Sequence, residues 1–467
     1  MKALFSTRPE SRSTNQKIFF AAVTVAAVGM LAKAGMTAKE LIVAKVFGRG
    51  DDLDAFLIAF LLPSFIVNLA IGSLSVAFLP MFVETREKQG TEASQKLFSS
   101  VLLLSVAALA ILAATLGVLA PYYLTLLGSN FSPAKLLLTR RLLYWVLPFV
   151  LFNGVSLFIT SALNAGEKFA LPALVPLLTP LVTITLLAAA HTLGVFSLAL
   201  GVVAGSAMEA AILIRSLRSH NLSARLRWYG MDERVRKVLA QFAPACAGSF
   251  LMGSTVVVDQ AMAGMLPPGS VSALSYANKF VGLIIAVGAA ALSTATAPYF
   301  SRMVANRQWN GCRHTIKKFS GLVFSAAVPI TIFLVVFSRP IIRLLFERGT
   351  FTAVDTLLVS KVQVCYALQI PFYICGMLFV RFLSSMKRNE VLMYGSLVNT
   401  ILNVSLNFLF IKFWGLPGIA LSTSCVYLFS FSFLGISSMR LITRAQRSEA
   451  ASRDMNNILV EAPEPSR

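Results

Sequence analysis

The chain has 467 residues, of which 57% are hydrophobic and only 13% are charged, and its mean hydropathy is +0.75. A soluble domain is about half apolar and about a quarter charged, so this chain has too little charge to cover a soluble fold of its size. Its net charge of +21 would suggest nucleic-acid binding in a soluble protein. We expect no nucleic acid here, because the basic residues lie between long apolar runs, where membrane topology and anionic lipid explain them.

Apolar stretches of about 20 residues recur along the chain, and each is long enough to cross a hydrocarbon core of about 30 Å. They are continuously apolar rather than alternating, which predicts helices instead of a barrel. The sequence therefore predicts an all-α integral membrane protein with about twelve transmembrane helices. The predicted spans are 18–47, 54–83, 97–126, 138–163, 170–190, 193–214, 238–264, 271–301, 319–338, 355–384, 391–411 and 415–439.

These spans form two groups of six, so we expect two six-helix lobes with a central cavity. The predicted parts are a cytoplasmic N-terminal tail, an N-lobe, a cytoplasmic linker, a C-lobe and a disordered cytoplasmic tail, at 1–17, 18–217, 218–237, 238–441 and 442–467. The two tails and the even-numbered loops, counted together with Arg381 near a span end, hold 28 Lys and Arg residues, whereas the opposite side, counted with Arg140 and Arg141, holds 8. This bias predicts that both termini are cytoplasmic.

The sequence also repeats itself at about half its length. Three pairs of matching positions are 218 to 223 residues apart: the pattern SxAxxPxF at 75–82 and 293–300, Pro148 with Pro371, and Gly194 with Gly415. Such a repeat predicts two halves of the same topology, related by an axis along the membrane normal, with a site between them. The alternative is that glycine and proline are simply common in membrane helices.

Charged side chains within the predicted spans form a first candidate site. A Lys at the centre of a span costs about 2.5–3.5 kcal/mol, so such residues usually face a cavity or a partner. Several cations and few anions predict a positive cavity that suits an anionic substrate such as a phosphate. The candidate substrate-binding residues are Lys33, Lys39, Glu40, Lys45, Asp54 and Lys279. Internal pairing of the first-span lysines with Glu40 or Asp54 is the alternative, as is snorkelling for Lys45.

Lys33 and Lys39 are six positions apart, which is about 240° around an ideal helix. A straight helix cannot aim both side chains in one direction. We therefore expect the first helix to bend or unwind near Gly29 or Gly35.

A second polar set involves Asp259, the only acid within the seventh span. Asn399, Asn403 and Asn407 follow at i, i+4 and i+8 on one face of the eleventh span. Carboxylate, amide and hydroxyl oxygens suit a small hard cation, which makes Asp259, Asn403, Asn407 and Thr423 a candidate Na⁺ site. Hydrogen bonding between helices is the alternative reading of the same residues.

The sequence contains no nucleophile–base arrangement, no GxxxxGK[ST] or GxGxxG motif and no CxxC pair. We therefore expect no enzymatic activity, no bound cofactor and no zinc or disulfide framework. Transport driven by Na⁺ coupling, H⁺ coupling or the membrane potential would be compatible with these absences.

Several segments together resemble the MviN/MurJ family. They are residues 33–48, 54–63, 77–80, 346–352, 402–409 and 418–421, in order along nearly the whole chain. The resemblance implies a lipid II flippase of peptidoglycan synthesis, within the multidrug/oligosaccharidyl-lipid/polysaccharide exporter superfamily. It also implies two six-helix lobes around a cationic cavity in the bacterial inner membrane.

Some positions depart from the family pattern. The first-span arginines of the family correspond to Lys33, Lys39 and Lys45 here, and its aspartate corresponds to Glu40. Its eighth-span Asp-Arg pair reads Asn278-Lys279, which adds Asn278 to the candidate substrate-binding residues. Charge is kept but the bidentate guanidinium fork is lost. The resemblance, with these departures, implies that the substrate is lipid II or another undecaprenyl-linked saccharide, such as an exopolysaccharide or O-antigen precursor.

Three functions remain open at this point. The first is a flippase for a polyprenyl-pyrophosphate-linked saccharide that works by alternating access. The second is an ion-coupled small-molecule exporter of the same superfamily, which would need an acidic cavity. The third is a non-transporting scaffold in a polysaccharide assembly complex. The expected partners are the saccharide lipid, membrane lipids and polysaccharide or cell-wall synthesis proteins, with the chain itself a monomer.

Overall fold

The computed structural model describes residues 14–166, 169–218 and 222–461, and these residues are almost entirely helical. Ten helices in this part of the chain are long and apolar enough to cross a membrane. The first half contains α1 (Thr14–Phe47), α2 (Asp51–Leu127), α3 (Pro133–Ala165), α4 (Ala170–Leu174), η2 (Val175–Leu177), α5 (Leu178–Ala189), η3 (His191–Leu193) and α6 (Phe196–Leu217). The second contains α7 (Glu233–Ala263), α8 (Ser270–Ala305), α9 (Trp309–Phe346), α10 (Ala353–Ala367), α11 (Ile370–Ser385), α12 (Asn389–Trp414) and α13 (Leu416–Glu461).

Helix α2 contains two of the predicted spans. Its 77 residues would extend about 115 Å at 1.5 Å per residue, far more than one bilayer crossing. The polar residues 84–96 separate its two apolar halves, and Gly90 among them has a φ of 83°, which glycine adopts without a steric penalty. The fifth span is α4, η2 and α5 in succession, and the tenth is α10 with α11. With α2 counted twice, these ten helices account for eleven of the twelve predicted spans, in the predicted order. The first predicted span corresponds to α1, which is not among the ten.

The chain forms two compact units, Met1–Phe250 and Leu251–Arg467. The boundary lies inside α7, rather than in the predicted linker at 218–237. The first half of α7 belongs to the N-terminal unit because it contacts α2. Arg234 at its start donates to Gln89 at 2.8 Å, and the Phe250 ring packs on Phe65 with centroids 6.0 Å apart.

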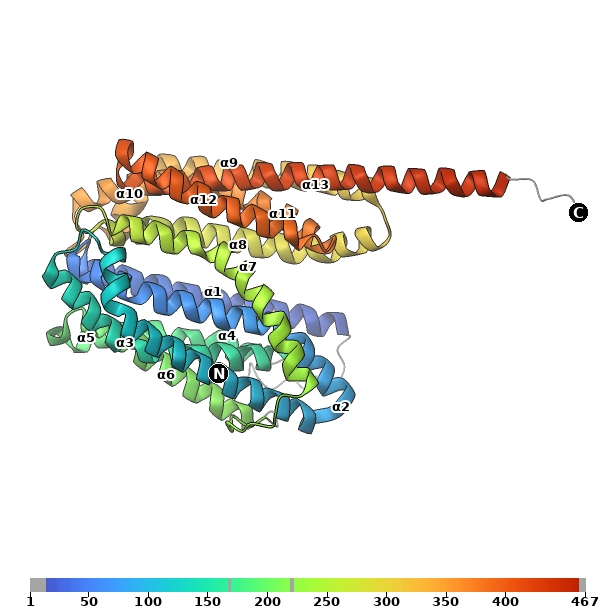
Figure 1. The fold of residues 1–467 in the computed structure, drawn as a ribbon. Coiled ribbons are helices and arrows are strands. Elements are labelled where there is room, and N and C mark those ends of the chain that lie inside the picture. The colour runs from blue at the N-terminus through green and yellow to red at the C-terminus, as the bar shows by residue number, and fades with distance from the viewer. Residues whose placement is uncertain (1–13, 167–168, 219–221, 462–467) are drawn as a thin grey trace, which may run out of the picture. The chain divides into compact units, whose positions relative to one another are not determined.

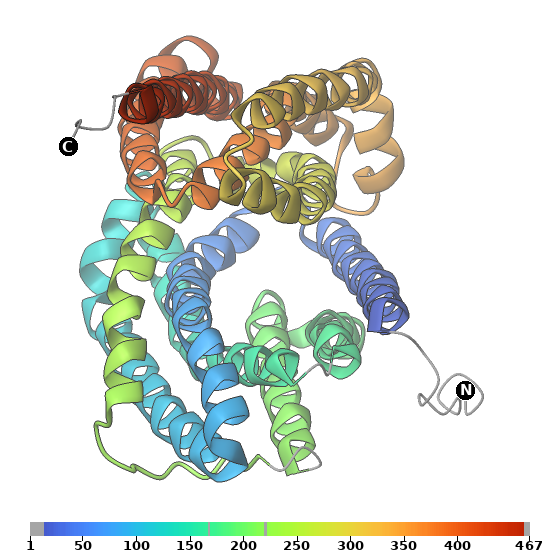
Figure 2. The same ribbon diagram turned by 90° about the vertical axis from the view of Figure 1, so that its right-hand side faces the viewer.

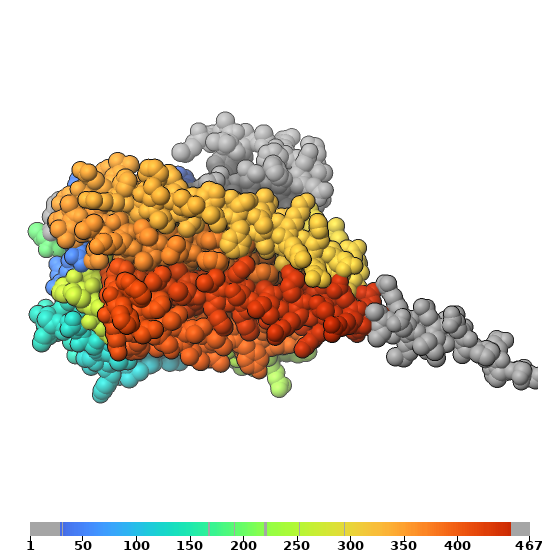
Figure 3. Space-filling view, turned by 90° about the horizontal axis from the view of Figure 1, so that it is seen from above, coloured from blue at the N-terminus to red at the C-terminus, as the bar shows by residue number. Residues whose placement is uncertain are grey.

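The two units repeat one packing plan. In the N-terminal unit α3 packs against α2 and α6, and α5 packs against α6 (Figure 1 and Figure 2). In the C-terminal unit α10 and α11 pack against α8 and α13, and α12 packs against α13. The red surface of α13 runs beside the orange-yellow surface of α9, which it contacts (Figure 3). The fourth and fifth spans of each unit therefore contact its sixth.

Individual residues of the predicted repeat occupy matching positions. Gly194 and Gly415 have φ values of 51° and 59° with the same ψ of −133°, just before the last helix of each unit. Ser75 shares a hydrogen bond of 2.7 Å with Ser161 in the fourth span. Its counterpart Ser293 accepts a hydrogen bond from Arg381, in the tenth span. The repeat predicted from the sequence is thus present in the backbone and in the contacts between helices.

The end of α13 differs from the prediction. Residues 442–467 were expected to be disordered, but α13 continues to Glu461 (Figure 1). The segment after Arg440 is polar, yet it is rich in Ala, Arg, Glu and Leu and has no glycine or proline before Pro463. The polar composition of this segment therefore belongs to a helix that extends beyond the last apolar span, and not to the predicted disordered tail. Residues 462–467, and residues 1–13 of the predicted N-terminal tail, lie outside the described part.

Candidate functional site

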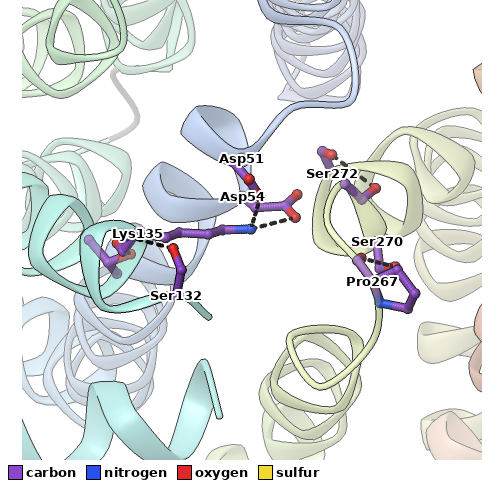
Figure 4. Close-up of polar contacts among 9 residues, drawn as sticks. Asp51, Asp54, Ser132, Lys135, Pro267, Ser270 and Ser272 are labelled. Carbon is purple, nitrogen blue, oxygen red and sulfur yellow. Dashed lines mark hydrogen bonds and ion pairs between the residues drawn. The ribbon is translucent and has the colours of Figure 1, made fainter. Parts of the chain in front are cut away.

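A buried ion-pair cluster joins the starts of α2 and α3. The Lys135 ammonium contacts Asp51 Oδ1 at 2.5 Å and Asp54 Oδ2 at 3.2 Å (Figure 4). Lys135 lies on the first turn of α3, whose N-terminus Ser132 caps by accepting from the Lys135 backbone N–H at 3.3 Å. The same ammonium stands 3.9 Å from the centre of the Phe131 ring. Asp54 is 1% exposed and Lys135 is 7% exposed, so this pair is shielded from water.

Asp54 was predicted either to line a substrate cavity or to pair with a lysine of the first span. In the structure it forms an ion pair, but its partner is Lys135 and not a first-span lysine. Lys135 was not among the candidate residues, since it stands near the start of a span in what reads as an outer loop. No local pattern links it to Asp54, which is 81 positions away.

The first-span lysines lie on a continuous helix. Lys33 is exposed on α1, whereas Lys39 is partly buried and pairs with Glu40 at 3.0 Å. Helix α1 is continuous from Thr14 to Phe47, so the predicted unwinding near Gly29 or Gly35 does not occur. Lys33 and Lys39 therefore point in directions about 120° apart. Gly35 serves close packing, because a Cβ there would lie 2.7 Å from Leu177 Cδ2.

Three other predicted residues are exposed on their own units. Lys45 lies near the end of α1, and Asn278 and Lys279 are adjacent on α8. Lys45 and Lys279 each make further interactions within the described chain. That Lys33 or Lys39 shares one cavity with Lys279 stays a prediction.

The second predicted set converges inside the C-terminal unit. Helix α7 supplies Asp259, α12 supplies Asn403 and Asn407 one turn apart, and α13 supplies Thr423. Both asparagine amides donate to Asp259 Oδ1, Asn403 at 3.0 Å and Asn407 at 2.8 Å. The Thr423 hydroxyl donates to Asp259 Oδ2 at 2.8 Å. We call these four residues the Asp259 cluster; all are buried, with Asn407 fully inaccessible.

Asp259 differs from Asp54 in the charge of its partners. Within the described residues, no Lys, Arg or His forms an ion pair with Asp259; its hydrogen-bond partners are neutral. Asn407 Oδ1 is buried and accepts no hydrogen bond from any described group. One carboxylate, two amide oxygens and one hydroxyl are a donor set that fits Na⁺. The same contacts also fit the alternative interpretation, hydrogen bonding between helices, because they join α7, α12 and α13.

A cavity of about 170 Å³ adjoins the Asp259 cluster within the C-terminal unit. Helices α7, α11, α12 and α13 line it, and Asn403 and Thr423 form part of its wall. Asn399 and Ser430 also line it and bond to each other at 3.2 Å. Asn399 Oδ1 is buried without a hydrogen-bond partner in the described chain, so a water in the cavity could satisfy it.

A buried acid that was not a candidate lies in the N-terminal unit. Glu209 on α6 is 5% exposed, and its Oε1 accepts from the Thr179 hydroxyl at 2.7 Å and the Thr179 backbone N–H at 3.3 Å. Gly205, one turn earlier, allows this approach, because a Cβ there would lie 2.5 Å from Thr179 Cα. Glu209 could have been identified from the sequence, because it follows a Gly-x-x-x-Gly pattern by four residues.

Comparison with known proteins decides the family. The family model described as lipid II flippase MurJ matches residues 43–451. The chain belongs to the MurJ family. The MviN/MurJ resemblance seen in the sequence is therefore confirmed.

MurJ relatives match most of the chain. The probable lipid II flippase MurJ of Bdellovibrio bacteriovorus is 28% identical over 382 residues, covering 79% of this chain and 72% of that protein. The lipid II flippase MurJ of Burkholderia cenocepacia is 24% identical over 426 residues, covering 87% and 80%.

Solved structures confirm the fold. A lipid II flippase MurJ in an inward closed conformation has a TM-score of 0.77 at 23% identity and covers 95% of this chain and 94% of that one. An inward-facing multidrug transporter of the MATE family gives 0.74 at 15% identity, covering 91% and 99%. The all-α membrane fold shared with MurJ and MATE proteins agrees with the sequence prediction.

Proposed function

We propose that this chain is a flippase for lipid II, a polyprenyl-pyrophosphate-linked saccharide, in the bacterial inner membrane. The observation that carries the proposal is the match of the lipid II flippase model to residues 43–451. The fold supports it, because the solved MurJ and MATE structures that it resembles are transporters and match almost the whole chain. The proposed mechanism is alternating access, in which the two units expose the substrate site to each side in turn without covalent chemistry.

The lysines of α1 and α8 are the proposed contacts for the pyrophosphate. Lys33 and Lys279 are exposed, and Lys39 keeps about a quarter of its side chain accessible despite its pair with Glu40. An ammonium that donates to a phosphate oxygen contributes about 1.5–3 kcal/mol. Charge, rather than a bidentate fork, is what lysine supplies at these positions.

Neutralisation of the α1 lysines tests this proposal. The double variant Lys33→Gln, Lys39→Gln should fail to support growth of cells depleted of their own flippase, and should flip little lipid II in reconstituted vesicles. Lys33→Arg, Lys39→Arg should retain both activities. Lys88→Gln, which removes an exposed lysine paired with Glu84, is the matched control.

Three results would redirect the proposal. Full activity of the double Gln variant would exclude the pyrophosphate role of Lys33 and Lys39. Vesicles that flip an O-antigen or exopolysaccharide precursor but not lipid II would reassign the substrate. A scaffold would flip no saccharide lipid in vesicles.

We also propose that Na⁺ couples to transport at the Asp259 cluster. In support, the cluster gathers a buried carboxylate with no cationic partner among the described residues, and an amide oxygen without a hydrogen-bond donor. Bound Na⁺ would balance the Asp259 charge, with Asn403, Asn407 and Thr423 completing the oxygen set. H⁺ coupling and the membrane potential are the competing sources of energy.

Thermal unfolding in detergent with Na⁺ or K⁺ at equal ionic strength tests the coupling. At Na⁺ near 100 times its Kd, the parent protein should gain about 2.7 kcal/mol. Asp259→Asn should remove this gain while the protein stays folded, and Glu209→Gln, which neutralises a buried acid of the other unit, should keep it. A parent protein that responds equally to both salts would exclude the Na⁺ site.

The proposed orientation places both termini in the cytoplasm. It rests on the 28 basic residues of the tails and even-numbered loops against 8 on the other side. A reporter inserted after Gly230 should then label from the cytoplasm, and one after Pro268 from outside. The reverse labelling would invert the topology.

A further inference from the structure

Residues 222–231, which connect α6 to α7, form an extended segment fixed to α2 at two points; we call it the linker strap. Ser223 exchanges two hydrogen bonds with the Gln95 side chain: its N–H donates to Oε1 at 2.8 Å, and its carbonyl accepts from Nε2 at 2.9 Å. The Tyr229 N–H donates to Ser100 Oγ at 3.3 Å. The strap therefore has a fixed course along α2, although it contains no helix or strand.

The far end of the linker strap is also fixed. Gly230 has a φ of 98°, which lets the chain turn toward α7. Asp232 then caps that helix, because its Oδ1 accepts from the Val235 N–H at 2.9 Å. Arg234 donates to Gln89 at 2.8 Å and so holds the first turn of α7 against α2.

Between its fixed points the strap exposes basic and large apolar side chains together. Leu226, Trp228 and Tyr229 are 52%, 43% and 42% exposed. Arg225 and Arg227 are exposed beside them, and the Arg227 guanidinium lies 5.3 Å from the centre of the Tyr229 ring. In an extended chain alternate residues point to opposite sides, so Leu226 and Trp228 share one side and the two arginines share the other.

The attachment to α2 sets the level of the strap relative to the membrane. The second apolar run of α2 begins at Leu97, and the anchoring residues Gln95 and Ser100 lie on either side of this position. The strap is thus attached at the start of the predicted span 97–126, which corresponds to the membrane–water boundary, where Trp and Tyr rings are enriched. Exposed apolar side chains are expected to contact lipid at such a level.

The charges around the strap leave its arginines available. Four acids of the neighbouring α2 bend and of the start of α7 pair with other cations: Glu84 with Lys88, Glu92 with Lys96, Asp232 with Arg234 and Glu233 with Lys237. In the described chain, neither Arg225 nor Arg227 makes an ion pair. An exposed guanidinium pair at the headgroup level is complementary to phosphate, which its fork can bind with two hydrogen bonds.

We propose that the linker strap is a binding site for anionic glycerophospholipid, with Arg225 and Arg227 on the headgroup phosphate and Leu226 and Trp228 among the upper acyl chains. The site is separate from the proposed pyrophosphate contacts on α1 and α8. It does not depend on which saccharide lipid is transported. Its role is to hold the junction between α6 and α7 at the surface of the leaflet.

Native mass spectrometry of the full chain, titrated with phosphatidylglycerol and separately with phosphatidylcholine, tests the site. Each basic residue near an anionic surface contributes roughly five-fold in affinity, so Arg225→Gln, Arg227→Gln should weaken the tightest phosphatidylglycerol binding about thirty-fold. Phosphatidylcholine binding should hardly change. Trp228→Ala should weaken both lipids, because it removes the apolar contact.

The matched control is Arg313→Gln, Lys317→Gln, which removes two exposed charges from α9. It should leave the tightest phosphatidylglycerol binding unchanged. An equal loss in the control would show that net charge alone attracts the lipid, and would overturn the proposal; unchanged binding in the strap variant would do the same. Both variants alter exposed side chains, and equal unfolding temperatures in phosphatidylcholine alone verify that they fold.

Discussion

The two units share one packing plan, but two of their buried carboxylates, Asp54 and Asp259, have partners of different charge. In the N-terminal unit, Asp54 forms an ion pair with Lys135 at 3.2 Å, and Lys135 also contacts Asp51. In the C-terminal unit, Asp259 receives three hydrogen bonds from neutral groups and no ion pair from the described residues. The same scaffold therefore carries one buried carboxylate with a cationic partner and one whose hydrogen-bond partners in the described chain are all neutral.

This difference indicates where an external cation can act. A buried charge without a counter-charge is costly, and a small cation that enters beside it lowers that cost. The cavity at Asn403 and Thr423 offers room for such an ion, whereas Lys135 already occupies the equivalent role beside Asp54. Of these two acids, we therefore expect Asp259, which has a cavity beside its partners, to be the one that responds to added cations.

The largest effect should follow from breaking the N-terminal pair. Lys135→Met leaves Asp54 buried without its cation and should lower the free energy of unfolding by about 3–5 kcal/mol. The double variant Lys135→Met, Asp54→Asn should recover much of this loss, because it also removes the orphaned charge. Unfolding of the purified protein in detergent measures both. A loss below 1 kcal/mol in the single variant would mean that water still solvates Asp54.

A smaller effect should be equal in the two units. Gly194→Ala and Gly415→Ala each place a side chain at positive φ with ψ near −133°, which costs about 1–3 kcal/mol. Because the two backbones match, the losses measured by thermal unfolding should agree closely. Gly376→Ala is the control, since a Cβ there meets no atom within 4 Å. Clearly unequal losses would show that the two turns are not equivalent in energy.

The smallest effect should differ between the units. Ser75→Ala removes a bond between two neutral hydroxyls, and such bonds between membrane helices average about 0.6 kcal/mol. Ser293→Ala removes the acceptor of the Arg381 guanidinium, so its loss should be larger, about 1–2 kcal/mol. A double-mutant cycle with Ser161→Ala and Arg381→Met separates each pair energy from packing effects. A pair energy for Ser293–Arg381 no larger than that for Ser75–Ser161 would contradict this order.

The spans and the Asp259 cluster were accessible from sequence because both are marked by local patterns. A continuous apolar run is a direct signal of a span. An acid alone in such a run, and three asparagines at i, i+4 and i+8, each mark a polar face buried among helices. In the structure, Asn403 and Asn407 donate to Asp259, as expected for polar faces that converge within a membrane, whereas a Na⁺ site at this point stays a prediction.

The ion pair of Lys135 was not accessible in this way. It depends on the relative register of α2 and α3, which no short pattern encodes. The end of α13 was misread for a different reason: after Arg440 the charge pattern changes while the helix propensity does not. Composition distinguishes membrane-spanning segments from water-exposed ones, but it does not distinguish a water-exposed helix from a disordered segment.

The position of the unit boundary inside α7 has a consequence for biosynthesis. The last helix that lies wholly within the N-terminal unit ends at Leu217, yet the unit is complete only at Phe250. A ribosome adds about 5–20 residues per second, so the first six spans wait about 2–7 s for the contacts of α7 with Gln89 and Phe65. During that interval the nascent N-terminal helices are held by their mutual packing alone, and a translational pause between these two points would prolong their exposure to the insertion machinery.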